Sequence, residues 1–420
     1  TEGVFQFESA GMTATVMKLR PERLEDLIAV ISLYRPGPMD SIPTYIRNRH
    51  EPDRIVYKHP LLKGILEVTY GCIVYQEQVM QIFRTLAGYS YGRADIVRRA
   101  MAKKKAAVLE NERKAFIYGE KGQCCGAVAN GVPANVANEI FDEMTSFASY
   151  AFNKSHAAAY AVVSYQTAYL KYYYPVEFMA ALMTSVIDNP GKVSEYIYSC
   201  RQMGIKILPP DINKGEGSFS VDGGNIRYGL AAIKSIGKPV IESIIQERKN
   251  GGEFSNLKDF IERLSGKEVN KRTIESFIKS GAFDSLGGTR KQFMVVYVQI
   301  LDQVNRERKY SMTGQLSLFD IVSDDQKSEF DIPLPDVGEY EKETKLAFEK
   351  EVLGVYISGH PLEEYEEKWR KSISATTLDF QLDEETGRTK VRDGSREIIG
   401  GMITSKMIKY TKKNQTMAFI

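Results

Sequence analysis

The sequence predicts a mainly α-helical protein with small β portions. Through residues 1–200 apolar side chains repeat at helical spacing, as at Leu24, Leu27 and Ile31. A proline-marked joint at 207–213 then leads into short alternating segments such as 225–230, a pattern typical of strands. With 420 residues, of which 43% are hydrophobic, the chain is long enough for roughly two to four domains with cores of their own.

Composition narrows the class of protein. The longest apolar stretch, 157–170, is interrupted by Ser164 and Gln166, so we expect no membrane span and no membrane partner. The four cysteines show no C-x-x-C spacing, which favours a reduced chain in the cytoplasm. The chain opens at Thr1 without a leader or an initiator methionine, so we expect a fragment. The net charge of +2 leaves nucleic acid open as a partner.

The order of the elements predicts four regions. Residues 1–210 form one helical domain, and 211–345 contain short helices with glycine-bearing connections followed by an acidic linker. Residues 346–372 form a helical connector. Residues 373–420 alternate in strand fashion about a lysine-rich turn. Because that segment is too short for a five-stranded barrel, we expect the truncated start of a β domain.

A basic run at 97–105 holds five cations within about two helical turns. On one helix Arg98 or Arg99 lies four or five residues from Lys103, so these side chains share a face and could hold a polyphosphate between them. A solvated basic face is the commoner meaning of a charge run taken alone.

A second cationic cluster follows, with Asn153, Lys154, Ser155 and His156 directly before a helix expected to start near Ala157. Free N–H groups at a helix start bind phosphate, and these side chains would complete an anion site. Alternatively, Ser155 is an N-cap and His156 a packed core residue. The presence of two cationic clusters around one helical block favours the phosphate interpretation.

Residues 233–240 resemble a helix-hairpin-helix, in which a short turn presents backbone N–H groups to DNA phosphate. Gly237 lies in the turn between Lys234 and Lys238, and Pro239 suits the first turn of the next helix. Ser235 stands where such hairpins usually carry a first glycine. We expect Lys234, Ser235, Gly237 and Lys238 to contact DNA.

A second copy of the hairpin is expected around 270–283. It offers Lys271 and Arg272 for DNA, and Gly281 as a helix stop. A glycine helix stop is also common in any small helical domain, so this signal is weaker than that of the first hairpin.

The polar segment 314–320 carries a docking peptide signature. Gln315 would bond at the rim of a partner's pocket, Leu316 would add an apolar contact, and Leu318 with Phe319 would fill the pocket. Buried loop anchors look similar, and that alternative stays open.

No complete active site is visible in the sequence. It holds no close carboxylate pair in an apolar strand that would bind two Mg²⁺ ions, and no P-loop or nucleophile elbow. We therefore expect no catalytic residue and no metal ligand in this chain. His50, His59 and His360 lie in proline-rich or charged joints and are expected to be structural.

Eight long segments in a fixed order resemble the bacterial DNA polymerase III alpha subunit, in the form without an embedded exonuclease. They are 3–12, 32–50, 69–82, 97–105, 152–171, 207–213, 228–248 and 353–365. The resemblance implies a fingers domain up to residue 210, a tandem helix-hairpin-helix and clamp-binding region, and the start of an OB-fold. One departure is 124–131, which is expected to be a longer surface loop.

The resemblance also implies roles. The residues near the triphosphate of the incoming dNTP would be Arg98, Arg99, Lys103, Asn153, Lys154, Ser155 and His156. Residues 234–238 would hold the primer–template duplex, and 315–319 the sliding clamp. The parent would be a DNA-directed DNA polymerase whose Mg²⁺ is held by aspartates before Thr1, so the fragment alone would be inactive. Proofreading and clamp-loader subunits are further possible partners.

An alternative hypothesis is that the parent protein is not an enzyme but a non-catalytic scaffold that binds DNA and the sliding clamp. A paired aspartate motif on a strand upstream of residue 1 would favour the enzyme.

Overall fold

The computed structural model describes residues 1–103, 106–148, 150–264, 266, 269–312, 332–382, 388–403, 406–411 and 415–419. The chain divides into two compact units, of which the first comprises Thr1–Tyr172 with Leu382–Arg388, and the second the remainder. Among the described residues, no helix combines the length and the apolar character that crossing a membrane requires.

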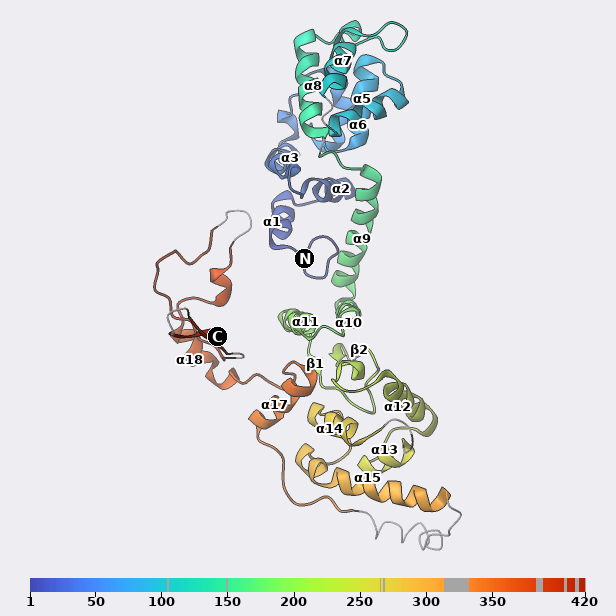
Figure 1. Ribbon diagram of the computed structural model, residues 1–420, viewed down its shortest axis with the longest axis vertical. Helices are drawn as coiled ribbons and strands as arrows, with labels where there is room; N and C mark the ends of the chain where they lie inside the picture. Colours follow the sequence, from blue (N-terminus) through green and yellow to red (C-terminus); the bar gives the residue numbers. More distant parts are fainter. Residues whose placement is uncertain are drawn as a thin grey trace. The chain divides into compact units, whose positions relative to one another are not determined.

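The N-terminal part of the first unit packs α1 (Ala10–Leu19), α2 (Leu24–Leu33) and α3 (Ile42–His50) beside α9 (Lys154–Tyr173) (Figure 1). Their shared core includes Leu33, Tyr45 and Tyr75, with the small residues Ala157 and Ala161 of α9. Small side chains on the inner face of α9 let this long helix lie close against its neighbours.

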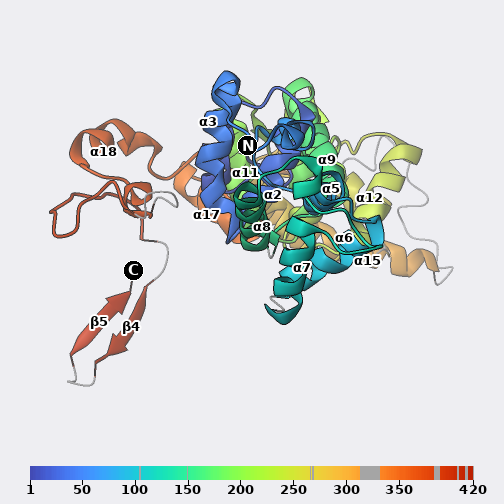
Figure 2. The ribbon, with the colours of Figure 1, turned by 90° about the horizontal axis from the view of Figure 1, so that it is seen from above.

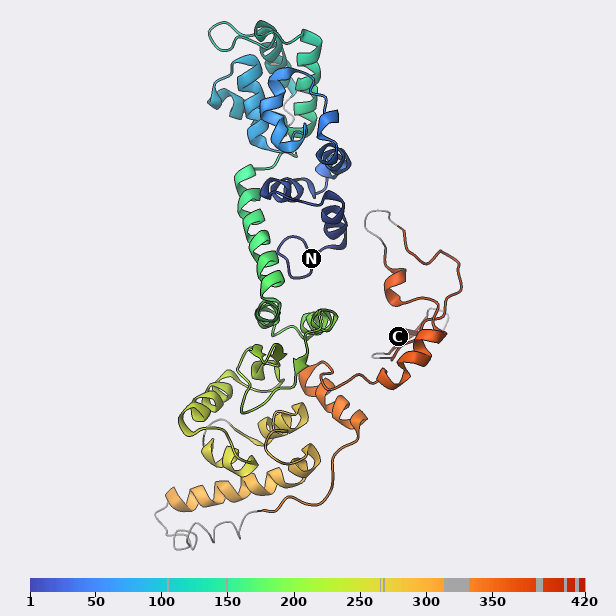
Figure 3. The same ribbon diagram turned by 180° about the vertical axis from the view of Figure 1, so that it is seen from behind.

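Four further helices of the first unit surround an aromatic core (Figures 1 and 3). They are α5 (Gln76–Ala87), α6 (Tyr91–Ala102), α7 (Ala106–Tyr118) and α8 (Ala134–Ala148). Phe83 meets Phe116 edge-on with ring centroids 5.2 Å apart, and Phe116 lies 5.7 Å from Phe141. Such tilted pairs add to the burial that holds the four helices together.

The expected surface loop at 124–131 is partly wrong, because its backbone is built into this group of helices. The Gly126 N–H donates to the Ala87 carbonyl at 3.0 Å, and Ala127 N–H donates to Phe116 at 2.8 Å. Ala127 is fully buried, although Cys125 is exposed. Residues 126 and 127 thus join the end of α5 to α7.

The second unit begins with α10 (Pro175–Ser185), α11 (Pro190–Gln202) and a small sheet. The strands β1 (Ile207–Leu208), β2 (Ser220–Asp222) and β3 (Asn225–Arg227) lie in the order β1-β3-β2. β1 runs parallel to β3 with Ile207 opposite Ile226, and β2 runs antiparallel to β3.

Helices of the second half of this unit share one core with α10 and α11. They are α12 (Lys238–Gly251), α13 (Leu257–Arg263), α14 (Lys271–Ser280), α15 (Arg290–Met312) and α17 (Lys342–Leu353). Phe283 packs 4.9 Å from Phe260 and 5.5 Å from Phe277 at its centre. The predicted domain limit at residue 210 falls between residues of this shared core, and the limits of the four predicted domains stay predictions.

The C-terminal part of this unit holds α18 (Glu366–Ser372) and an antiparallel pair, β4 (Met407–Tyr410) with β5 (Thr416–Phe419) (Figure 2). The pair confirms the strands expected about the lysine-rich turn, whereas 396–403 forms no strand. An OB-fold stays a prediction. The short elements are η1 (Pro38–Ser41), η2 (Pro52–Arg54), η3 (Pro60–Leu62), α4 (Lys63–Leu66), η4 (Glu67–Thr69), η5 (Val128–Asn130), η6 (Leu230–Ala232), η9 (Glu363–Tyr365) and η10 (Thr377–Phe380). The mainly helical fold class is confirmed.

Candidate nucleic-acid and nucleotide interface

The first hairpin is a tight turn that leads directly into α12. Ser235 has φ +70°, a left-handed conformation that glycine adopts without cost. Ser235 holds this conformation at a strain of roughly 1 kcal/mol, which a glycine at the same position would avoid.

The start of α12 is open to solvent. Gly237 is the N-cap and has no side chain to accept a hydrogen bond from the helix start. Ser235, Gly237 and Lys238 are exposed. The described residues provide no acceptor for the Gly237 and Lys238 amides, and free N–H groups at a helix start attract phosphate. This turn can present both donors and the Lys238 charge to an anion.

The opposite face of α12 fixes the turn in place. Val240, Ile241 and Ile244 are buried in the core of the second unit. Arg248 near the end of the helix donates to the carbonyls of Ile212 (3.1 Å) and Gly215 (2.8 Å). The anion-binding turn is thus presented by an anchored helix.

Lys234, also predicted to meet DNA, is already engaged. Its Nζ donates to the Glu351 carbonyl at 3.0 Å, and its own amide donates to the Val352 carbonyl at 2.8 Å. Both acceptors lie in the last turn of α17, where carbonyls lack helical partners. Lys234 therefore has hydrogen-bond partners within the protein, whereas Lys238 has no described partner.

In the predicted second hairpin, residues 270–283, the start of α14 carries a side-chain cap. Asn270 accepts a hydrogen bond from the Thr273 amide at 3.1 Å and so caps α14. Lys271 pairs with Asp302 at 3.4 Å, both side chains being about half exposed, while Arg272 is exposed. The predicted glycine helix stop is confirmed, since Gly281 ends α14 with φ +82°.

In the basic run on α6, two arginines bind the same carboxylate. Arg98 and Arg99 each reach Asp95 at 2.7 Å, and the Arg98 side chain is 13% exposed whereas that of Arg99 is 68% exposed. The hydrogen bonds from Arg98 are the largest cause that lowers the pKa of Asp95. Lys103 follows as the C-cap of the helix. Arg99 and Lys103 are thus the more accessible cations.

The cluster at 153–156 forms the first turn of α9, which begins at Lys154; the expected start near Ala157 is wrong. Asn153 accepts from the His156 amide at 2.9 Å, so Asn153, and not Ser155, caps the helix. Glu77 of α5 accepts from the Lys154 amide at 3.1 Å, so a carboxylate occupies this helix start.

Aromatic rings surround the side chains of the same turn. The Lys154 ammonium lies 5.4 Å from the Tyr75 ring centroid, and the His156 ring lies 4.3 Å from that of Tyr160. Arg35 stacks 4.3 Å above Phe152. An incoming phosphate at this turn would have to displace Glu77, and the triphosphate role of these residues stays a prediction.

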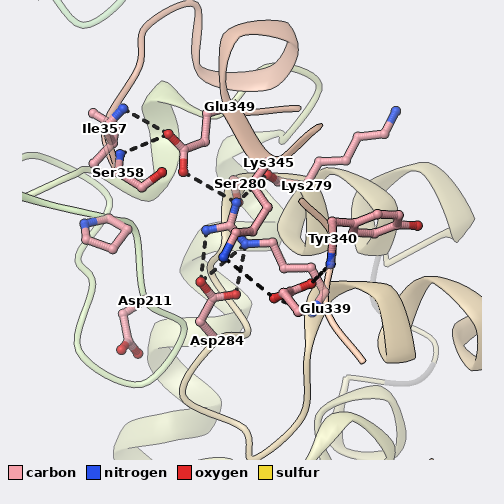
Figure 4. A network of polar contacts seen from close by, with 12 residues as sticks. Asp211, Lys279, Ser280, Asp284, Glu339, Tyr340, Lys345, Glu349, Ile357 and Ser358 are labelled. Carbon is pink, nitrogen blue, oxygen red and sulfur yellow. Dashed lines mark hydrogen bonds and ion pairs between the residues drawn. The ribbon is translucent and has the colours of Figure 1, made fainter. Parts of the chain in front are cut away.

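A buried ionic network, missed from the sequence, organises the second unit (Figure 4). The side chains of Arg290 and Glu349 are 4% and 0% exposed and lie 3.4 Å apart, and Arg290 also meets Asp284 at 2.9 Å. Burial is the largest single influence and lowers the pKa of Arg290, but the hydrogen bonds and the charges of Asp284 and Glu349 together outweigh it and raise that pKa. Glu349 in turn accepts from the Ile357 and Ser358 amides at 2.9 and 3.0 Å.

The histidines expected to be structural make backbone contacts. His59 accepts from the Leu61 amide at 3.3 Å and His360 from the Leu362 amide at 3.1 Å, while His50 meets the Lys18 carbonyl at 2.9 Å. Among the described residues, no group of three or more His, Cys, Asp or Glu is arranged to hold a metal ion. Gln315, Leu316, Leu318 and Phe319 lie outside the described residues.

Two hairpins on one helical core, the first with its helix start open, define a helix-hairpin-helix protein. A family model described as "Helix-hairpin-helix motif" matches residues 204–293. A second, described as "Bacterial DNA polymerase III alpha subunit finger domain", matches residues 1–124.

Curated relatives extend the match over the whole chain. DNA polymerase III subunit alpha of Thermus aquaticus is 43% identical over 100% of this chain and 33% of the relative. The subunits of Borreliella burgdorferi and Neisseria meningitidis are 41% and 42% identical over 99% and 100% of this chain, and over 35% of each relative. The chain belongs to the bacterial DNA polymerase III alpha family, and it spans about a third of the length of these relatives.

Proposed function

We propose that this chain is the part of a replicative DNA polymerase that contacts the primer–template duplex and the incoming dNTP. The observation that carries the proposal is the α12 hairpin, where two amides without a described acceptor and the exposed Lys238 form one surface. Its family membership supports the same role, because the named relatives are DNA polymerase III alpha subunits. In a bacterium the cytoplasm is the compartment where such an enzyme works.

The duplex contact would be independent of sequence. Backbone amides and a lysine ammonium recognise phosphate oxygens, which are the same at every base pair. Each phosphate neutralised by a cation releases condensed counterions, so binding weakens steeply with salt, by a slope of about 0.9 per phosphate for B-form DNA.

The dNTP contact would lie in the first unit. Arg99 and Lys103 are accessible, and Arg98 orients the shared Asp95 carboxylate. A triphosphate would attract the two arginines away from Asp95, since an oxyanion with several charges forms stronger charge-assisted hydrogen bonds than one carboxylate. Asn153, Lys154, Ser155 and His156 would act at the α9 turn once Glu77 is displaced.

The remaining partners follow from the family alone. From the resemblance to DNA polymerase III alpha subunits we propose that the Mg²⁺ ligands belong to another region of the polymerase. That makes this chain alone unable to extend a primer, because phosphoryl transfer needs the metal to offset developing charge. The sliding clamp would bind at 315–319, and proofreading and clamp-loader subunits would bind the same enzyme.

The test measures binding of the 420-residue chain to a fluorescent duplex at several salt concentrations. We expect Lys238→Met to make the salt slope shallower by about 0.9, the loss of one phosphate contact. Lys249→Met is the matched control, because Lys249 is an exposed lysine in the last turn of the same helix. It should leave the slope unchanged. Equal slopes for both variants, or no binding at low salt, would contradict the proposal.

A further inference from the structure

The turn of the first hairpin rests on the end of another helix. Lys234, directly before the strained Ser235, is held twice by the last turn of α17, through its amide at 2.8 Å and its ammonium at 3.0 Å. Tyr228, which precedes the hairpin in the chain, donates a hydrogen bond from its hydroxyl to the Leu353 carbonyl at 3.1 Å. Three consecutive carbonyls of α17, from residues 351 to 353, therefore accept from Lys234 and Tyr228.

The end of α17 is itself rigidly placed. Glu349 binds both Arg290 and the backbone of 357–358, and its side chain is fully buried. Lys279 of α14 pairs with the Glu351 carboxylate at 2.8 Å. Because α17 is fixed from two sides, its last carbonyls can fix the position of the residue that they hold.

The chemistry suits a permanent contact. The last carbonyls of a helix lack intrahelical partners and carry the negative end of the helix dipole, so a lysine ammonium there is stabilised twice over. An unusual backbone conformation such as that of Ser235 persists only where its surroundings over-determine it. The double anchor at Lys234 supplies that constraint on one side, and the buried Ile233 and Val240 supply it through the core.

We infer that Lys234 is a positioning residue, which holds the phosphate-binding turn 235–238 on the C-terminal end of α17, and that it is not itself a phosphate ligand. This revises the role expected from the sequence. The inference rests on the proposed duplex binding only for its functional consequence, since the contact between Lys234 and the end of α17 is a property of the free chain.

The first experiment measures hydrogen–deuterium exchange of the 420-residue chain without DNA. Lys234→Met should speed exchange in the peptide that spans 233–240, and Lys234→Arg, which still donates to a carbonyl, should restore protection. Lys350→Met is the control, because the Lys350 ammonium also donates to a carbonyl near the end of α17, that of Gly354, at 2.9 Å. It removes a similar bond without touching the hairpin and should leave this peptide unchanged. Unchanged exchange in Lys234→Met would overturn the inference.

The second experiment measures duplex affinity against salt on the same variants. Lys234→Met should weaken binding at fixed salt about fivefold, the worth of one ordinary hydrogen bond, with the slope unchanged and with rescue by Lys234→Arg. Lys238→Met should reduce the slope. A slope reduced by about 0.9 in Lys234→Met would make Lys234 a phosphate ligand and overturn the inference. If the unaltered chain binds no duplex, the proposed function fails, while the exchange data still decide whether the contact of Lys234 with α17 holds the turn 235–238 in place.

Discussion

The helix starts of α12 and α14 look alike in sequence and differ in structure. Each begins at a lysine within a polar turn, yet α12 has the bare Gly237 as its N-cap whereas α14 has the side chain of Asn270. Lys238 is exposed without a described partner, while Lys271 pairs with Asp302 at 3.4 Å. The α12 start has no side chain that accepts from its amides, whereas at the α14 start the Asn270 side chain accepts from the Thr273 amide at 3.1 Å.

The difference shows that a capping side chain decides between two uses of a helix start. A capped start contributes about 1 kcal/mol to stability, and an uncapped one leaves that interaction available for an anion. We therefore expect changes at the α14 hairpin to affect mainly stability, and changes at the α12 hairpin to affect mainly DNA binding.

The largest effect should come from Gly281→Ala. A Cβ there would lie 2.2 Å from Nη2 of the buried Arg290, at φ +82°. Strain plus disruption of the Arg290 network should lower the free energy of unfolding by about 3 kcal/mol or more, measured by urea titration. Gly287→Ala is the control, because its φ of +78° is similar but nothing lies within 4 Å of its Cβ; about 1 kcal/mol is expected there.

Gly237→Ala makes the corresponding substitution at the α12 hairpin. Gly237 has φ −79° and its Cβ would meet only Pro239 Cδ, at 3.6 Å. Stability should change by roughly 0.5 kcal/mol or less. Equal losses for Gly237→Ala and Gly281→Ala would mean that both hairpins are structural.

A smaller effect is expected at Ser235. Its φ of +70° is tolerated by serine but strongly disfavoured for a β-branched side chain. Ser235→Val should lower the unfolding free energy by about 1–2 kcal/mol and weaken duplex binding, because the turn must change shape. Ser235→Gly should retain both properties, and a thermal melt beside duplex titration would separate the two. A harmless Ser235→Val would show that the turn is not constrained.

A further prediction concerns Asn270→Ala. Loss of the bond to the Thr273 amide should cost about 1 kcal/mol in the unfolding free energy, the usual value of an N-cap. Duplex affinity should stay as it is, since Asn270 and the Thr273 amide bind each other and Lys271 pairs with Asp302. An affinity that rises or falls clearly in this variant would place DNA on the second hairpin too.

Much of the fold could be predicted from residue patterns. Helical spacing at Leu24, Leu27 and Ile31 corresponds to α2, and the proline-marked joint corresponds to β1 and the segment that follows it. Positional errors arose where a side chain's partner lies far along the chain. The start of α9 was placed about three residues late, because the cap by Asn153 and the carboxylate of Glu77 both depend on contacts that spacing does not reveal.

The sequence by itself determined the family, the helical class and the positions of the two hairpins, because these depend on local propensity and on motifs read in order. Only the tertiary structure decided which lysine of the first hairpin is available. Both lysines of the first hairpin are exposed, but α17, more than a hundred residues away in the chain, binds Lys234 through its terminal carbonyls, whereas Lys238 has no described partner. Unpaired groups at a helix end find partners by proximity in space, which the order of residues does not encode.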